Sequence, residues 1–107
     1  MVHEENTRVS IKLERDMIFN LQNSYKNLDS LLIDESLDEQ KEKVGPDAAS
    51  LLGLAVISCL SASLLFCLNK RNLTLDDLEA KADISFKEPK KGYMRIASIE
   101  VKMIPKT

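Results

Sequence analysis

The 107-residue sequence contains no tryptophan, only two tyrosines and three phenylalanines, and no excess of basic residues. Lysine and arginine together number 15, against 17 aspartates and glutamates, for a formal net charge of −2. A nucleic-acid-binding surface needs cations to attract phosphates and aromatic rings on which bases stack. The composition therefore predicts no nucleic acid partner.

Motifs for metal ions, cofactors and phosphates are also missing. The sequence has no C-x-x-C or H-x-x-x-H spacing, and its single histidine, His3, lies in a segment expected to fray. The three glycines are scattered at 45, 53 and 92, so no phosphate-binding loop is present. We expect neither metal nor cofactor. The first residues lack the apolar segment of a secretory signal, which predicts a cytoplasmic chain with two free thiols.

Apolar residues recur at every second position in "TRVSIKL" (7–13) and again in "MIFNL" (17–21). This period is typical of half-buried strands, so a hairpin is expected, followed by a short third strand in "SLLID". Residues 7–34 thus form the N-terminal strands. Residues 35–45 carry many charges of both signs and are expected to be a solvated loop.

A long central helix is predicted over residues 46–71. Pro46 suits the first helical turn, and Asp47 complements the positive end of the helix dipole. Asn72 can supply a left-handed stop after the basic pair that closes the helix. Small side chains along the helix predict close approach of another helix or a sheet at Gly53, Ala55, Cys59 and Ser63.

Residues 76–104 form a C-terminal strand pair around the turn "EPKKGY". In the last strand the apolar face changes parity between Ile96 and Ile99, and an extra residue near Ala97–Ser98 would restore it. This predicts a β-bulge. The order of elements predicts a single α+β domain over residues 1–107, with an antiparallel sheet packed on one long buried central helix.

The central helix has a membrane-spanning alternative. It is uncharged from Leu51 to Leu68 and would be about 27 Å long, the short limit for a membrane span. A glycine and three serines lower its hydrophobicity, no aromatic belt flanks it, and the amphipathic strands on both sides need a core. The sequence therefore favours a soluble chain whose helix is covered by a partner subunit.

The segment "GPDAASLLGLAVISCLSASLLFCLNKR" (45–71) resembles the central helix of the OsmC/Ohr family, most closely its archaeal OsmC-like branch. The decapeptide "CLSASLLFCL" is the specific part, and the strands up to residue 103 also resemble the family. The resemblance implies an α+β fold that forms an intertwined homodimer around this helix. It further implies a thiol peroxidase acting on organic hydroperoxides or hydrogen peroxide, with Cys59 as the peroxidatic cysteine.

Two features depart from the family pattern. Members of the family continue into a further helix that carries a resolving cysteine, whereas this sequence ends at Thr107. Active members also carry a Pro-Glu pair near the start of the helix, and its glutamate supports the catalytic arginine. Those two positions hold Ala48 and Ala49 here.

Peroxide reduction requires a thiolate. Cys59 lies too far into the helix for the dipole at the N-terminus to stabilise one, so a nearby cation is needed. Arg15 and Arg8 are the candidates that the sequence offers, although either can equally be a solvated strand residue. Cys67 cannot resolve Cys59 within one helix, because the two lie about 12 Å apart along its axis and disulfide Cα atoms must come within roughly 7 Å.

Two functions remain open from the sequence. The first is an OsmC-like protein of oxidative or osmotic stress defence that reduces hydroperoxides through Cys59. The second is a catalytically incomplete OsmC-like dimeric domain, with a binding or structural role for a small molecule. In that case Cys59 is a small buried apolar residue.

Overall fold

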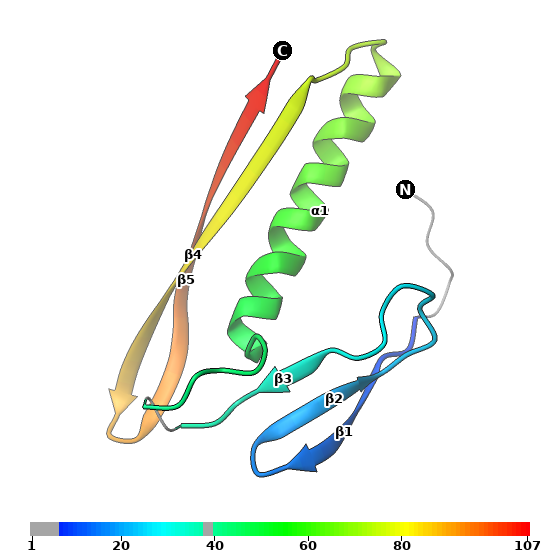
Figure 1. The fold of residues 1–107 in the computed structure, drawn as a ribbon. Coiled ribbons are helices and arrows are strands. Elements are labelled where there is room, and N and C mark those ends of the chain that lie inside the picture. Colours follow the sequence, from blue (N-terminus) through cyan, green and yellow to red (C-terminus); the bar gives the residue numbers. More distant parts are fainter. Residues whose placement is uncertain (1–6, 38–39) are drawn as a thin grey trace. The chain divides into compact units, whose positions relative to one another are not determined.

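The computed structural model describes residues 7–37 and 40–107 and has the predicted α+β class (Figure 1). The chain divides into two compact units. We call residues up to Ala48 the N-terminal unit and Ala49–Thr107 the C-terminal unit. The elements are β1 (Ser10–Arg15), β2 (Ile18–Gln22), β3 (Leu32–Asp34), α1 (Ala48–Lys70), β4 (Asp77–Lys90) and β5 (Tyr93–Lys106).

The N-terminal unit is a three-stranded antiparallel sheet in the order β1-β2-β3. Phe19 lies opposite Leu13 of β1 and Ile33 of β3, which places these apolar side chains on one face of the sheet. Ile33 is buried on that face, whereas Leu13 is 57% exposed, and Ile18 is buried on the other face of β2. Met17 was expected to share the alternation of β2, but it lies in the turn before the strand and is exposed.

The backbone around Gly45 runs beside β3 before the helix begins. The N–H of Asp34 donates to the carbonyl oxygen of Pro46 at 3.0 Å. A Cβ at position 45 would collide with the backbone carbonyl of Leu32, so glycine is required by this close approach. The sequence predicted Pro46 in the first helical turn, and this is wrong. The hydrogen bond to β3 holds the backbone of Pro46 outside the helix. Helix α1 begins at Ala48.

The predicted stop at the end of α1 is confirmed. Asn72 has a positive φ of 57°. Its N–H donates to the carbonyl of Asn69 at 3.1 Å, and the N–H of Leu73 donates to the carbonyl of Leu68 at 2.9 Å. These two bonds form a Schellman motif, which satisfies carbonyl groups that the last helical turn would otherwise leave unpaired.

The predicted β-bulge in the last strand is also confirmed. Ser98 pairs with Ser85 and Ile96 pairs with Phe86, which leaves Ala97 as the extra residue of β5. Strands β4 and β5 form a long antiparallel hairpin, closed by a turn in which Gly92 has a φ of 81°. Because the bulge restores the alternation, the apolar side chains of both strands share one face.

Helix α1 lies along this hairpin (Figure 1), but it is not the buried helix that the sequence predicted. Gly53 is its one buried residue, and a Cβ there would lie 2.8 Å from Cδ1 of Ile84 and 3.6 Å from Cβ of Ala82. The close approach expected at Ala55, Cys59 and Ser63 is not made, since all three are exposed. The reason is geometric: a two-stranded hairpin can cover only one side of a helix.

The antiparallel strands form two separate sheets rather than the single sheet that we expected. Strands β1, β2 and β3 pair with one another, and β4 pairs with β5. The helix connects the end of the first sheet to the start of the second. Each unit consequently keeps an apolar surface of its own, exemplified by Ile11 and Leu13 in the first and Leu54 and Phe66 in the second.

Candidate functional site

Cys59 lies on the uncovered side of α1. Successive residues of an α-helix are about 100° apart around its axis. The six-residue step from Gly53 therefore turns Cys59 by about 120°, away from the hairpin. The structure gives it as an exposed free thiol. The large apolar residues exposed on this helix are Leu52, Leu54, Leu60, Leu65 and Phe66, each between 40% and 52% exposed. We call Cys59 with Leu52, Leu54, Leu65 and Phe66 the open helix face, because Leu60, seven residues after Gly53, lies on the same side of the helix as Gly53.

No cation accompanies Cys59 within the described part of the C-terminal unit: no hydrogen bond or ion pair there involves its sulfur. The two cations at the end of the helix are engaged elsewhere. Nζ of Lys70 lies 5.0 Å from the centre of the Phe66 ring, and Nη1 of Arg71 donates to the carbonyl of Cys67 at 3.3 Å. Both contacts stabilise the C-terminal end of α1 rather than a thiolate at Cys59.

The two arginines predicted as activating cations belong to the N-terminal unit. Arg15 ends β1 and lines a hollow of about 360 Å³ together with Asp16, Lys41 and Glu42. Arg8 is exposed just before β1. Cys59 belongs to the C-terminal unit, so the joint action of Arg15 or Arg8 with Cys59 stays a prediction.

Cys67 is a second exposed free thiol on the same continuous helix. The rise of α1 places it about 12 Å from Cys59 along the axis, beyond the reach of a disulfide. The two cysteines therefore act independently as long as α1 stays folded. If Cys59 is oxidised, its resolving thiol has to come from another molecule.

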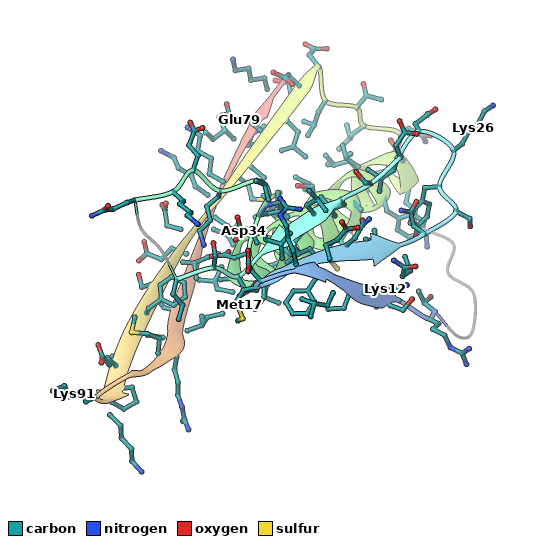
Figure 2. All side chains as sticks on the ribbon, turned by 60° about the horizontal axis from the view of Figure 1, so that its bottom comes forward. Lys12, Met17, Lys26, Asp34, Glu79 and Lys91 are labelled. Carbon is teal, nitrogen blue, oxygen red and sulfur yellow. The ribbon has the colours of Figure 1, made fainter. Side chains whose placement is uncertain are left out.

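Among the described residues, the buried polar side chain is one that the sequence did not single out. Asp34, at the end of β3 near Met17, is only 2% exposed (Figure 2). Its Oδ1 accepts hydrogen bonds from the hydroxyl of Ser36 at 2.5 Å and from the N–H of Ser36 at 2.9 Å, and its Oδ2 accepts from the N–H of Val44 at 3.1 Å. We call these contacts the Asp34 clasp, because they tie both ends of the 35–44 loop to β3.

The clasp also perturbs the acidity of the carboxyl group. The hydroxyl of Ser36 first, and then the backbone N–H groups of Ser36 and Val44, lower the pKa of Asp34 from 3.8 to about 2. Lys43 acts in the same direction, and its ammonium group donates to the carbonyl of Ser36 at 2.5 Å. Every acceptor that Asp34 offers faces a donor of its own loop, which makes it a structural carboxylate.

A carboxylate from outside the helix meets the start of α1. Oε1 of Glu35 accepts a hydrogen bond from the backbone N–H of Ala48, the first helical residue. It thereby satisfies one of the N–H groups that a helix start leaves unpaired. The sequence predicted only a solvated loop here. The available signal was the run "LLIDES", in which acidic residues directly follow a strand and precede a helix start.

Metal binding and a membrane span are two other possibilities that bear on the site. Among residues 7–37 and 40–107, no three His, Cys, Asp or Glu side chains gather in a way that could hold a metal ion. His3 lies outside the described residues. Helix α1 is long and apolar enough to cross a membrane, with an 18-residue window of mean hydropathy 2.4, of which 6% is buried. By length and composition, α1 therefore fits a membrane span as well as the core helix of a soluble protein.

Comparison with known proteins bears on the fold. No family model and no curated protein matches the sequence. A crystal structure from Psychrobacter arcticus 273-4, of a protein named as a candidate osmotic stress induced and detoxification response protein, has a TM-score of 0.76 with this chain. The match covers 100% of this chain and 75% of that one, at 11% sequence identity. At this identity the similarity shows the fold alone: an α+β fold with antiparallel sheets and one helix, consistent with an OsmC-like fold.

Proposed function

We propose that this protein is an OsmC-like protein of oxidative or osmotic stress defence, acting in the cytoplasm, in which Cys59 reduces hydroperoxides. One observation carries the proposal: the exposed thiol of Cys59 lies on an apolar helix face at the position that resembles the peroxidatic cysteine of the family. An apolar surface beside the thiol suits the alkyl part of an organic hydroperoxide. The fold shared with a protein named for osmotic stress and detoxification supports it.

The proposed chemistry uses the thiol and an external reductant. The Cys59 thiolate attacks the outer oxygen of a hydroperoxide, the O–O bond breaks, and the alkoxide leaves and takes up a proton to become the alcohol. The sulfur is oxidised by two electrons to a sulfenic acid. One thiol of an external dithiol then forms a mixed disulfide and releases water, and its second thiol displaces Cys59 as a free thiol. The dithiol ends as a disulfide, so one dithiol is consumed per peroxide.

The direct test is peroxide consumption by the full chain. We expect cumene hydroperoxide to be consumed in the presence of dithiothreitol, with one equivalent of dithiol oxidised per equivalent of peroxide. Without reductant, intact-mass analysis should show the addition of one oxygen per chain. Consumption no faster than in dithiothreitol alone, with a properly folded protein, would contradict the proposal.

A second candidate function is favoured by what surrounds the thiol. Ala48 and Ala49 stand where active members of the family carry Pro-Glu, and no cation of the C-terminal unit pairs with Cys59 in the described structure. Both features fit a catalytically incomplete OsmC-like domain with a binding or structural role. In the same assay this alternative predicts a folded dimer that neither consumes peroxide nor gains oxygen.

We further propose that the functional form is a homodimer in which a second copy covers the large apolar side chains of the open helix face and leaves the thiol of Cys59 open to peroxide. The large apolar side chains of this face are 40% to 52% exposed, and exposed apolar side chains gathered on one helix mark a protein–protein interaction surface. The family resemblance implies an intertwined dimer around the same helix. Burial of this face in a dimer would also shield the apolar helix from water without a membrane.

A charged substitution on the open helix face should separate the subunits. We expect the wild type to sediment at about twice 12.1 kDa at micromolar concentration, without detergent and at about 500 mM salt, where exposed charges are screened. Leu54→Glu should weaken dimerisation at least about 100-fold, because an unpaired carboxylate would be buried in the interface. Leu37→Glu is the matched control, since Leu37 is 89% exposed in a loop. A monomeric wild type, or a protein soluble only in detergent, would contradict the dimer.

A further inference from the structure

The outer face of the β4–β5 hairpin carries like charges directly opposite each other. Its apolar face is turned to α1, as the contacts of Gly53 with Ile84 and Ala82 establish, so the odd-numbered residues of β4 point outward up to the bulge. Directly opposite side chains of an antiparallel pair are about 4.5–5.5 Å apart at Cβ, where like charges destabilise the sheet. The like-charged cross-strand pairs are Lys81 with Lys102, Asp83 with Glu100, and Lys87 with Arg95.

Two of these pairs are neighbours and have opposite signs. We call Lys81 and Lys102 the basic row, and Asp83 and Glu100 the acidic row. All four residues are exposed. Nζ of Lys81 lies 3.5 Å from Oε1 of Glu79 on its own strand, and no ion pair within the described residues involves the other three.

This arrangement is self-complementary. A second copy turned end for end would place its acidic row against the basic row of the first copy, and its basic row against the acidic row. Contacts of this reciprocal kind are the mark of a two-fold symmetric interface. Beyond the two rows, Glu79 of each copy would face Ser85 and Ser98 of the other copy. The hydroxyl groups of these serines can donate hydrogen bonds to the carboxylate of Glu79. A copy in the parallel orientation would set like charges against like charges.

Other partners match this face less well. A polyanion would be attracted by the basic row and repelled by the acidic row beside it, and a polycation would meet the reverse. A second copy in the antiparallel orientation is the one occupant that neutralises both rows at once. In Figure 2 the two rows lie on the hairpin between Glu79 and the hairpin tip at Lys91.

We infer that the outer face of the β4–β5 hairpin is a salt-sensitive docking surface for a second copy of this chain, with the basic row of each copy facing the acidic row of the other. The surface differs from the open helix face, which lies on the other side of α1 from the hairpin. A monomer present at high salt should therefore double in mass when the charges are unscreened, and a dimer, which carries two such surfaces, should at least double. The inference does not depend on the chemistry of Cys59.

Sedimentation of the full chain at two salt concentrations tests this inference. At about 20 mM salt exposed charges interact over tens of ångströms, whereas at about 500 mM the interaction is nearly screened. We expect the mass at least to double between high and low salt. The variant with Lys81→Glu and Lys102→Glu, and the variant with Asp83→Lys and Glu100→Lys, should each lose the doubling. Equal masses of the wild type at both salt concentrations would overturn the inference.

The decisive variant exchanges the two rows. A chain with all four substitutions is again self-complementary, so it should regain the doubled mass at low salt, as should an equimolar mixture of the two double variants. If the mixture associates but the four-fold variant does not, the attraction is unspecific and the inference fails. It also fails if all variants sediment like the wild type. Thermal melts of each variant establish that it is folded.

Discussion

Replacing Cys59 by serine is expected to abolish dithiol-dependent hydroperoxide consumption, with a loss of rate on the order of 100-fold or more. A serine hydroxyl is not ionised at neutral pH and cannot be oxidised to a sulfenic acid. Cys67→Ser should leave the rate within about twofold, because Cys67 cannot reach Cys59 along the intact helix. The measurement is the initial rate of cumene hydroperoxide consumption with dithiothreitol.

The pair of variants is informative because both thiols are exposed. If accessibility alone decided, both thiols would be oxidised equally. We expect peptide mass spectrometry to show oxygen added at Cys59 and not at Cys67, and the cause of this selectivity would be the surroundings of Cys59 in the assembled protein. An added small thiol should convert the modification into a mixed disulfide. Equal losses in both variants, or a disulfide joining residues 59 and 67 in the native protein, would contradict this account of the helix.

Removing the carboxylate of Asp34 is expected to give the largest loss of stability of any single polar substitution in the N-terminal unit. Asp34→Ala leaves the N–H groups of Ser36 and Val44 and the hydroxyl of Ser36 without their acceptor in a buried site. We expect the thermal midpoint to fall by about 5–10 °C. Asp29→Ala is the matched control, because Asp29 is exposed, and it should change the midpoint by no more than about 2 °C.

The contribution of Asp34 should also depend on pH. Its pKa of about 2 in the folded protein is below the ordinary value of 3.8, so the folded state favours the ionised form. The stabilisation is complete above the ordinary pKa and is lost as the pH falls from about 4 towards 2. Urea midpoints of the wild type and Asp34→Asn should therefore differ by a constant amount near neutral pH and converge below pH 3. If the two urea midpoints still differed by the same amount at pH 2, the negative charge of Asp34 would not be the source of the stabilisation.

Much of the local structure was predictable because its causes lie close together in the sequence. Period-two patterns predicted β1, β2, β4 and β5, and the apolar segment "SLLID" suggested β3. The parity change between Ile96 and Ile99 predicted the bulge at Ala97. Asn72 predicted the end of the helix, since a left-handed residue there closes the last turn. The position of Cys59 on that helix followed from the same local pattern together with the family resemblance.

The tertiary structure decided what depends on residues far apart in the sequence. The burial of Asp34, the engagement of the Ala48 N–H by Glu35 and the need for glycine at 45 arise because the 35–48 segment folds back on β3. The opposition of Lys81 to Lys102 depends on the register of the hairpin, which the bulge and the turn set together. Likewise, the sequence determined that α1 is apolar on all sides, but only the packing decided which side is covered. One hairpin reaches one side of a helix, and Cys59 lies on the other.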